Sequence, residues 1–162
     1  MQNAKDTFYV TLRNRLATIN PARTMTLRSV MRPAIYVEEA ESPQPLPILD
    51  AYALRWTGTS RLAEMPLPLV AMSCQIFYAT AGTQSMAGLD RGRVLAAMDA
   101  EVEQMLSPLQ AQKMLYSSTG STPMQTMIFW SEPQFEPIVA VRDQLSRIAQ
   151  VTLWSWQEAS ES

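Results

Sequence analysis

The sequence predicts an α+β fold, a mainly antiparallel sheet with two amphipathic helices packed on one face. Two segments repeat apolar residues every three or four positions, which is typical of helices, and other segments alternate apolar residues in steps of two, which is typical of strands. The expected order is helix, strand, excursion, strand, helix, strand, strand. This order indicates a layered α+β arrangement and not a doubly wound parallel sheet.

The first helix is expected over residues 7–19, with a cap at Asp6 or Thr7. Its apolar stripe comprises Phe8, Leu12, Leu16 and Ile19. The second helix is expected over residues 89–106, with Asp90 as its cap. Its core stripe comprises Leu95, Met98, Val102 and Met105. Both stripes predict helices that bury one side.

Strands are expected at 29–38, 70–79, 125–131 and 148–157, and residues 142–147 are interpreted as a helical turn. The clearest strand has four apolar side chains on one face, Met72, Cys74, Ile76 and Tyr78. The last strand has an inner face of Ala149, Val151 and Leu153. In the third strand, Met127 and Phe129 are expected on the inner face.

The 162 residues are enough for one domain with a full core, which we place at residues 1–157. Prolines bracket residues 41–68, so this stretch is expected to be an extended loop or an excursion hairpin that carries contacts. The tail at 158–162 is expected to be frayed.

The composition argues against catalysis. The chain has no histidine and a single cysteine, Cys74, which lies in an apolar strand pattern and is expected to be a buried thiol. Lys5 and Lys113 are both expected at the surface. Neither a phosphate-binding glycine motif nor a nucleophile elbow occurs, so we expect no enzyme activity, no cofactor and no bound metal.

The acidic residues have an ordinary interpretation as solvated surface. Glu101 and Glu103 are two apart, so on a helix they face different ways and cannot share a proton. Asp99 is expected on the same exposed side. The acidic run at 38–41 is either an exposed strand end or oxygen ligands for a divalent cation.

Tryptophans outside the expected core faces suggest a surface that contacts protein. Trp154 and Trp156 project from the face opposite the last strand's core face, and Trp130 is given the same relation to its strand. Either the same chain or a neighbouring subunit covers these rings. The full candidate subunit interface adds four residues of the excursion and comprises Leu46, Tyr52, Leu54, Trp56, Trp130, Trp154 and Trp156.

Positive charge is concentrated in the first 32 residues, although the net charge is −2. The pattern is either a solvated helix face or a basic rim that faces DNA or an acidic subunit. The candidate rim comprises Arg13, Arg15, Arg23, Arg28 and Arg32.

The layout resembles the tail-terminator or tail-completion proteins of long-tailed bacteriophages and prophages. The likeness covers most of residues 7–157 and runs through the following segments in order: TFYVTLRNRLATI, MRPAIYVEE, a proline-containing excursion, VAMSCQIFYATAG, LDRGRVLAAMDAEVEQML, TMIFWSEPQFEP and RIAQVTLWSW. The sequence differs from the family pattern in its long 41–68 insertion and in lacking a glycine turn before Arg-Pro-Ala.

The resemblance implies a structural protein that forms a ring, usually of six subunits, at the head-proximal end of a tail tube. Its partners would be further copies of itself, the tail tube protein and the head-connector protein, with non-specific contact to passing DNA. Assembly would take place in the host cytoplasm and the product would lie in the virion tail, with no membrane contact. The alternatives are a head–tail connector or other protein-interaction module, or a weak non-specific nucleic-acid-binding domain.

Overall fold

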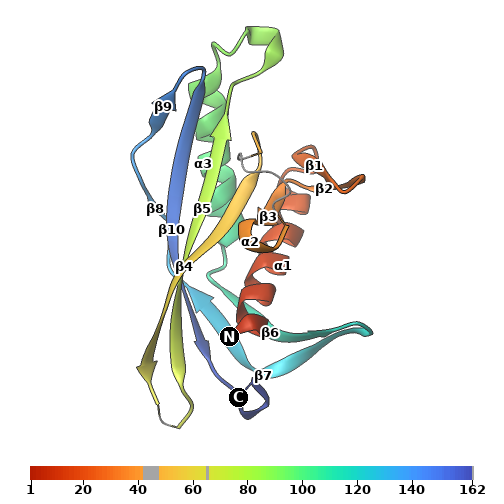
Figure 1. Ribbon diagram of the computed structural model, residues 1–162, viewed down its shortest axis with the longest axis vertical. Coiled ribbons are helices and arrows are strands. Elements are labelled where there is room, and N and C mark those ends of the chain that lie inside the picture. Colours follow the sequence, from red (N-terminus) through yellow and green to blue (C-terminus); the bar gives the residue numbers. More distant parts are fainter. Residues whose placement is uncertain (42–47, 65, 162) are drawn as a thin grey trace.

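The computed structural model describes residues 1–41, 48–64 and 66–161, which form an α+β fold with a mostly antiparallel, curled sheet (Figure 1). The predicted α+β class with a mainly antiparallel sheet is therefore confirmed. The helical elements are α1 (Gln2–Ile19), α2 (Glu38–Glu41), α3 (Arg91–Leu106) and the short 3-10 turns η1 (Gln84–Met86) and η2 (Ala159–Glu161).

One sheet of eight strands has the order β3-β4-β5-β10-β7-β6, and β8 and β9 also pair with β10. Its pairs are antiparallel except for β3 with β4. Two further strands, β1 and β2, form a separate hairpin. The strands are β1 (Thr24–Leu27), β2 (Val30–Pro33), β3 (Ile35–Val37), β4 (Tyr52–Ala63), β5 (Leu69–Thr80), β6 (Gln110–Ser117), β7 (Gly120–Trp130), β8 (Gln134–Phe135), β9 (Val139–Val141) and β10 (Gln144–Trp156).

The stretch predicted as an excursion contains β4, which is part of the main sheet. The first residues of β4 pair with β3 on one side and β5 on the other, so they lie in the core. A register shift follows between Trp56 and Gly58, and beyond it residues 57–62 are exposed. The β4–β5 hairpin therefore leaves the body of the molecule only in its distal half (Figure 1).

The helix α1 begins at Gln2, so Asp6 and Thr7 lie inside it and do not cap it. Thr7 instead accepts a hydrogen bond of 2.9 Å from the backbone N–H of Met114 and ties α1 to β6. The predicted stripe is confirmed, because Phe8, Leu12 and Leu16 have no exposed surface; Ile19 is partly buried.

The helix α3 also buries its predicted stripe completely. Asp90 occupies the cap position, but its carboxylate makes no bond to the helix. It accepts hydrogen bonds of 2.9 and 2.7 Å from the backbone and hydroxyl of Thr83 in the preceding loop.

The part of the sheet formed by the last third of the chain differs from the predicted structure. The hairpin strand β6 was not predicted, and residues 144–147 belong to β10 and not to a helical turn. The faces of β7 are also reversed: Ile128 and Trp130 are buried, whereas Phe129 is 41% exposed. The long pairing of β10 with β5 explains the early start, because it extends to Leu145 opposite Thr80.

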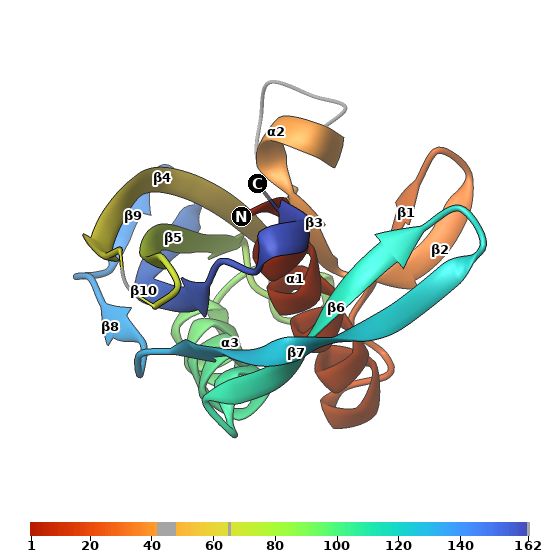
Figure 2. The same ribbon diagram turned by 90° about the horizontal axis from the view of Figure 1, so that it is seen from below.

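The predicted strand at 29–38 is divided into β2, β3 and the start of α2. The β1–β2 hairpin packs its inner side chains, Met25 and Leu27, on a small second core that includes Tyr36. In Figure 2 this hairpin and the β6–β7 hairpin extend to one side of the molecule, and β8 and β9 lie on the other side.

The segment predicted as a frayed tail is held in place as far as the structure describes it. Residues 159–161 form η2, and the side chain of Glu161 is 2% exposed. Its carboxylate binds Lys113, which is fully buried and not at the surface as predicted. Lys113 also donates a hydrogen bond of 2.7 Å to the carbonyl of Trp156.

Candidate functional site

Three predicted interface residues lie inside the chain. Tyr52 and Leu54 on β4 have no exposed surface, and Trp130 is 3% exposed. The indole N–H of Trp130 donates a hydrogen bond of 2.8 Å to the carbonyl of Leu106, and its ring meets that of Phe8 edge-on at 5.1 Å. These side chains have no free surface for a neighbour, so their predicted outward placement is wrong.

The other tryptophans are partly accessible. Trp56 packs edge-on against Phe8 at 5.9 Å, and the ammonium group of Lys5 lies 5.0 Å from the Trp56 ring centre. Trp154 and Trp156 are half-buried on the sheet face opposite Leu153, as their alternation predicts. Leu46 lies outside the described residues.

Three arginines of the predicted basic rim bind other parts of the same chain. Arg15 donates hydrogen bonds to the carbonyls of Met105, Pro108 and Gln110 at 2.9, 2.8 and 3.2 Å. Arg23 binds the carboxylate of Glu101. Arg32 binds Glu41 at 2.8 Å and also contacts Tyr9 and the carbonyl of Ile35.

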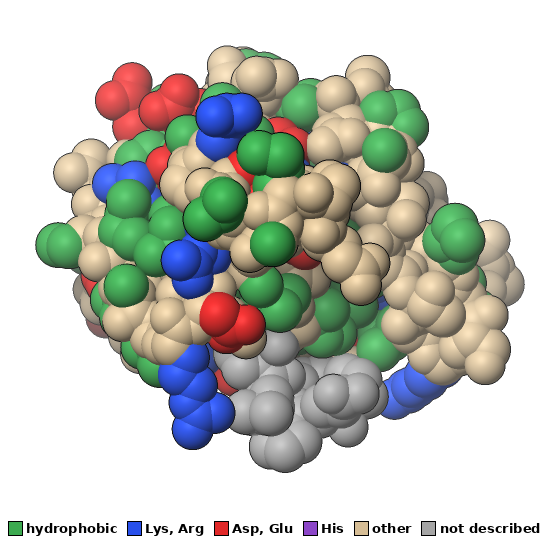
Figure 3. Space-filling model, turned by 90° about the horizontal axis from the view of Figure 1, so that it is seen from above, with side chains coloured by type: hydrophobic (Ala, Val, Ile, Leu, Met, Phe, Trp, Pro, Cys, Tyr) green, Lys and Arg blue, Asp and Glu red, His purple; other side chains and the backbone are tan. Residues whose placement is uncertain are grey.

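Of the five rim residues, Arg13, Arg15 and Arg28 form no ion pair within the described part of the chain. The guanidinium of Arg13 lies 5.5 Å from the ring centre of Tyr9, and Arg28 is exposed in the β1–β2 turn. Seen from above in Figure 3, the lysine and arginine side chains stand apart from one another and form no continuous band on that face.

Glu101 and Asp99, predicted as solvated surface, are structural. Glu101 is 8% exposed and accepts hydrogen bonds from Arg23, Asn20 and Tyr52. Burial alone would raise the pKa of Glu101, but these hydrogen bonds outweigh it and hold the pKa below its ordinary value. Asp99 binds Arg147 at 2.8 Å.

The single thiol is buried, and two carboxylates of the acidic run are paired with arginines. Burial raises the pKa of the Cys74 thiol to about 12, which keeps it protonated and unreactive at neutral pH. Glu38 and Glu41 of the acidic run bind Arg55 and Arg32, and no group of three metal-ligating side chains occurs among residues 1–41, 48–64 and 66–161. None of the helices in this part is long and apolar enough to cross a membrane.

The accessible features that remain are large apolar side chains on several projecting segments. They lie on the β1–β2 hairpin, the distal β4–β5 hairpin, the segment just before α3, the β6–β7 hairpin and the segment around β9. With exposures of 41–84%, they include Val30, Met31, Leu62, Leu89, Leu115, Phe129, Ile138, Val139 and Val141.

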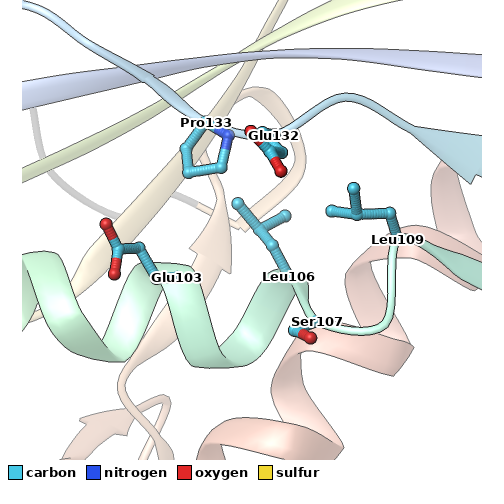
Figure 4. Close-up of a pocket in the computed structure, with 6 residues that line it drawn as sticks. All are labelled: Glu103, Leu106, Ser107, Leu109, Glu132 and Pro133. Carbon is cyan, nitrogen blue, oxygen red and sulfur yellow. The ribbon is translucent and has the colours of Figure 1, made fainter.

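A hollow of about 350 Å³ lies between the end of α3 and the segment that precedes β8. Figure 4 shows Glu103 projecting from α3 and Glu132 from the opposite segment, with Leu106 near Glu132 and Leu109 farther from Glu103. Pro133 and Ser107 complete the lining. The hollow has an apolar floor and two carboxylates at its edges.

Sequence reasoning missed this hollow because its walls come from α3 and from a loop about thirty residues later. Glu132 follows β7 directly and Glu103 lies on the exposed side of α3, so each alone has the pattern of ordinary surface. Proline at 133 after an exposed glutamate gave no signal of a pocket.

No protein-family model matches the chain, and no curated protein matches it.

Proposed function

We propose that the protein is a non-enzymatic structural subunit that assembles head to tail into a closed ring, in the manner of the tail-terminator proteins that its sequence resembles. The observation that carries the proposal is the set of exposed apolar side chains on segments that project to different sides of the body. Contacts between unlike surfaces of successive copies close into a ring when the rotation between copies permits.

The proposal includes the arrangement of α1 and α3 as one layer on the inner face of the sheet. Both helices contribute side chains to the same core cluster and contact each other. The opposite face of β10 and β7 is then available for a neighbour. There, Trp154 pairs across the strands with the exposed Phe129.

In the proposed ring, the partners are further copies of the chain, a tail tube protein below and a head-connector protein above. Internal ion pairs neutralise Arg23 and Arg32 and leave less free positive charge near the N-terminus, so contact with DNA would be weak and salt-sensitive.

Sedimentation equilibrium over a wide concentration range tests the proposal, together with electron microscopy of tail tubes grown with and without the protein. We expect one discrete oligomer and tubes of limited length. Trp154→Ala should weaken self-association by about 2 kcal/mol if this ring is an interface hot spot, while urea unfolding should show that the subunit still folds. A protein that stays monomeric at every concentration and leaves tube length unchanged would contradict the assignment.

A further inference from the structure

We propose that the β1–β2 turn of one copy inserts Arg28 into the acidic hollow between α3 and β8 of a second copy. The inference rests on the proposed head-to-tail assembly and names the contact that makes it.

The hollow can receive a long cationic side chain. Glu103 and Glu132 are exposed and make no hydrogen bond or ion pair with any other residue that the structure describes. The accessible apolar part of the lining is the partly exposed Leu109 and Pro133, and Leu106 also lines the hollow but has no exposed surface. An arginine combines an apolar stem with a charged planar head, so it matches both parts of this lining.

The floor of the hollow is held firmly from below. The carbonyl of Leu106 accepts the indole N–H of Trp130 at 2.8 Å, and Arg15 binds the carbonyl of Pro108 at 2.8 Å. Arg15 is not among the lining residues, and its donors are directed at three backbone carbonyls. A receptor fixed in this way loses little conformational entropy when it binds.

The β1–β2 hairpin holds Arg28 at an exposed turn. Arg28 and Ser29 are its two turn residues, with φ of 50° and 65°, as in a type I′ turn. Met25 and Leu27 anchor the inner side of the hairpin in the second core. On the outer side, Met31 is 73% exposed, while Val30, which pairs with Leu27 and shares its face, is 61% exposed beside the turn.

The two surfaces are therefore complementary in charge and in apolar character. In the proposed contact the cation of Arg28 meets two carboxylates, and Met31 on the outer face of the hairpin meets the apolar residues Leu109 and Pro133. The hairpin and β8, which follows Pro133 directly, lie on different sides of the body in Figure 2. A contact between them therefore joins two copies head to tail and leaves one free hairpin at one end of a chain of copies and one free hollow at the other.

The first test compares two hairpin-tip arginines. Arg28→Asn removes the cation and places a residue that favours positive φ in the turn, so folding should be preserved. Arg142→Asn is the matched control, because Arg142 is also exposed at a hairpin turn with positive φ, 55°. We expect Arg28→Asn to weaken self-association at least about tenfold by sedimentation equilibrium, and Arg142→Asn to leave it unchanged.

The second test uses charge reversal. Arg28→Glu and the double change Glu103→Arg with Glu132→Arg should each prevent assembly, because like charges would meet in the hollow. An equimolar mixture of the two variant proteins should assemble again in alternation, since each hairpin then finds a hollow of opposite charge. The protein that carries all three changes should also assemble alone.

The results of these tests separate the Arg28 contact from the ring proposal. If the parent protein assembles and all charge variants assemble equally well, this contact is wrong while the ring proposal stands. Weakening by Arg28→Asn without rescue in the mixture would mean that Arg28 contacts another surface, which also overturns the inference. If the parent does not self-associate at any concentration, both proposals fall.

Discussion

The ammonium group of Lys113 on β6 contacts the carboxylate of Glu161 on η2, and the two side chains are only 0% and 2% exposed. The pair joins the last described turn of the chain to a strand 48 residues earlier. A buried charge of this kind is stable only with its partner, because removal of one member leaves the other desolvated.

We therefore expect Lys113→Met to lower the free energy of unfolding by about 3–5 kcal/mol. Urea denaturation monitored by tryptophan fluorescence measures this change. The combined change Lys113→Met with Glu161→Gln is the control and should cost less than Lys113→Met alone, since it leaves no unpaired charge. Equal losses in the single and double variants would show that the ion pair has no part in the effect.

Two glutamates on α3 provide a matched comparison of buried and exposed carboxylates. Glu101→Gln removes the charge that binds Arg23 and accepts from Tyr52, so we expect a loss of about 3 kcal/mol or more. Glu103→Gln, two residues later and exposed, should change stability by less than about 0.5 kcal/mol. Thermal and urea unfolding of both variants check the contrast, and similar losses in both would count against it.

Arg15 should be essential to the junction between α3 and β6. Its guanidinium binds three backbone carbonyls in residues 105–110, and no single ammonium can reproduce that fork. We expect Arg15→Ala to cost at least about 2 kcal/mol and Arg15→Lys to recover only part of this. Arg13→Ala, on the same helix with one ring contact, is the control and should be nearly neutral. Amide hydrogen exchange of the α3 end should rise only in the Arg15 variants.

Stability should fall on acidification. Burial alone would raise the pKa values of Glu41, Glu101 and Glu161, but hydrogen bonds from their partners lower all three. A carboxylate with a lower pKa in the folded state stabilises the fold above its unfolded pKa of about 4.3 and loses this contribution as pH falls through the folded value.

Urea midpoints measured between about pH 2 and 8 should therefore be flat above about pH 6 and decline below about pH 4. Glu101→Gln should show a shallower decline than the parent, because one of the three groups no longer titrates. A midpoint that does not change down to about pH 2 would contradict the linkage.

The fold class and both helix stripes could be predicted from the sequence because they depend on local periodicity. Phe8, Leu12 and Leu16 recur at helical spacing, and Met72, Cys74 and Ile76 alternate along a strand, so each pattern identifies its own buried face. In β6 this signal was hidden, because the fully buried inward position is Lys113 and its apolar neighbour Leu115 is 43% exposed.

The sequence by itself determined the α+β class, the two helices and the thiol buried in β5, since apolar spacing along a few turns or strand residues decides these. Only the tertiary structure decided the role of the charged residues. Arg23 and Glu101 are 78 residues apart, and the walls of the acidic hollow come from two distant elements. Whether a charge is solvated or paired depends on which segments meet around it, and that depends on long-range packing, which no local pattern records.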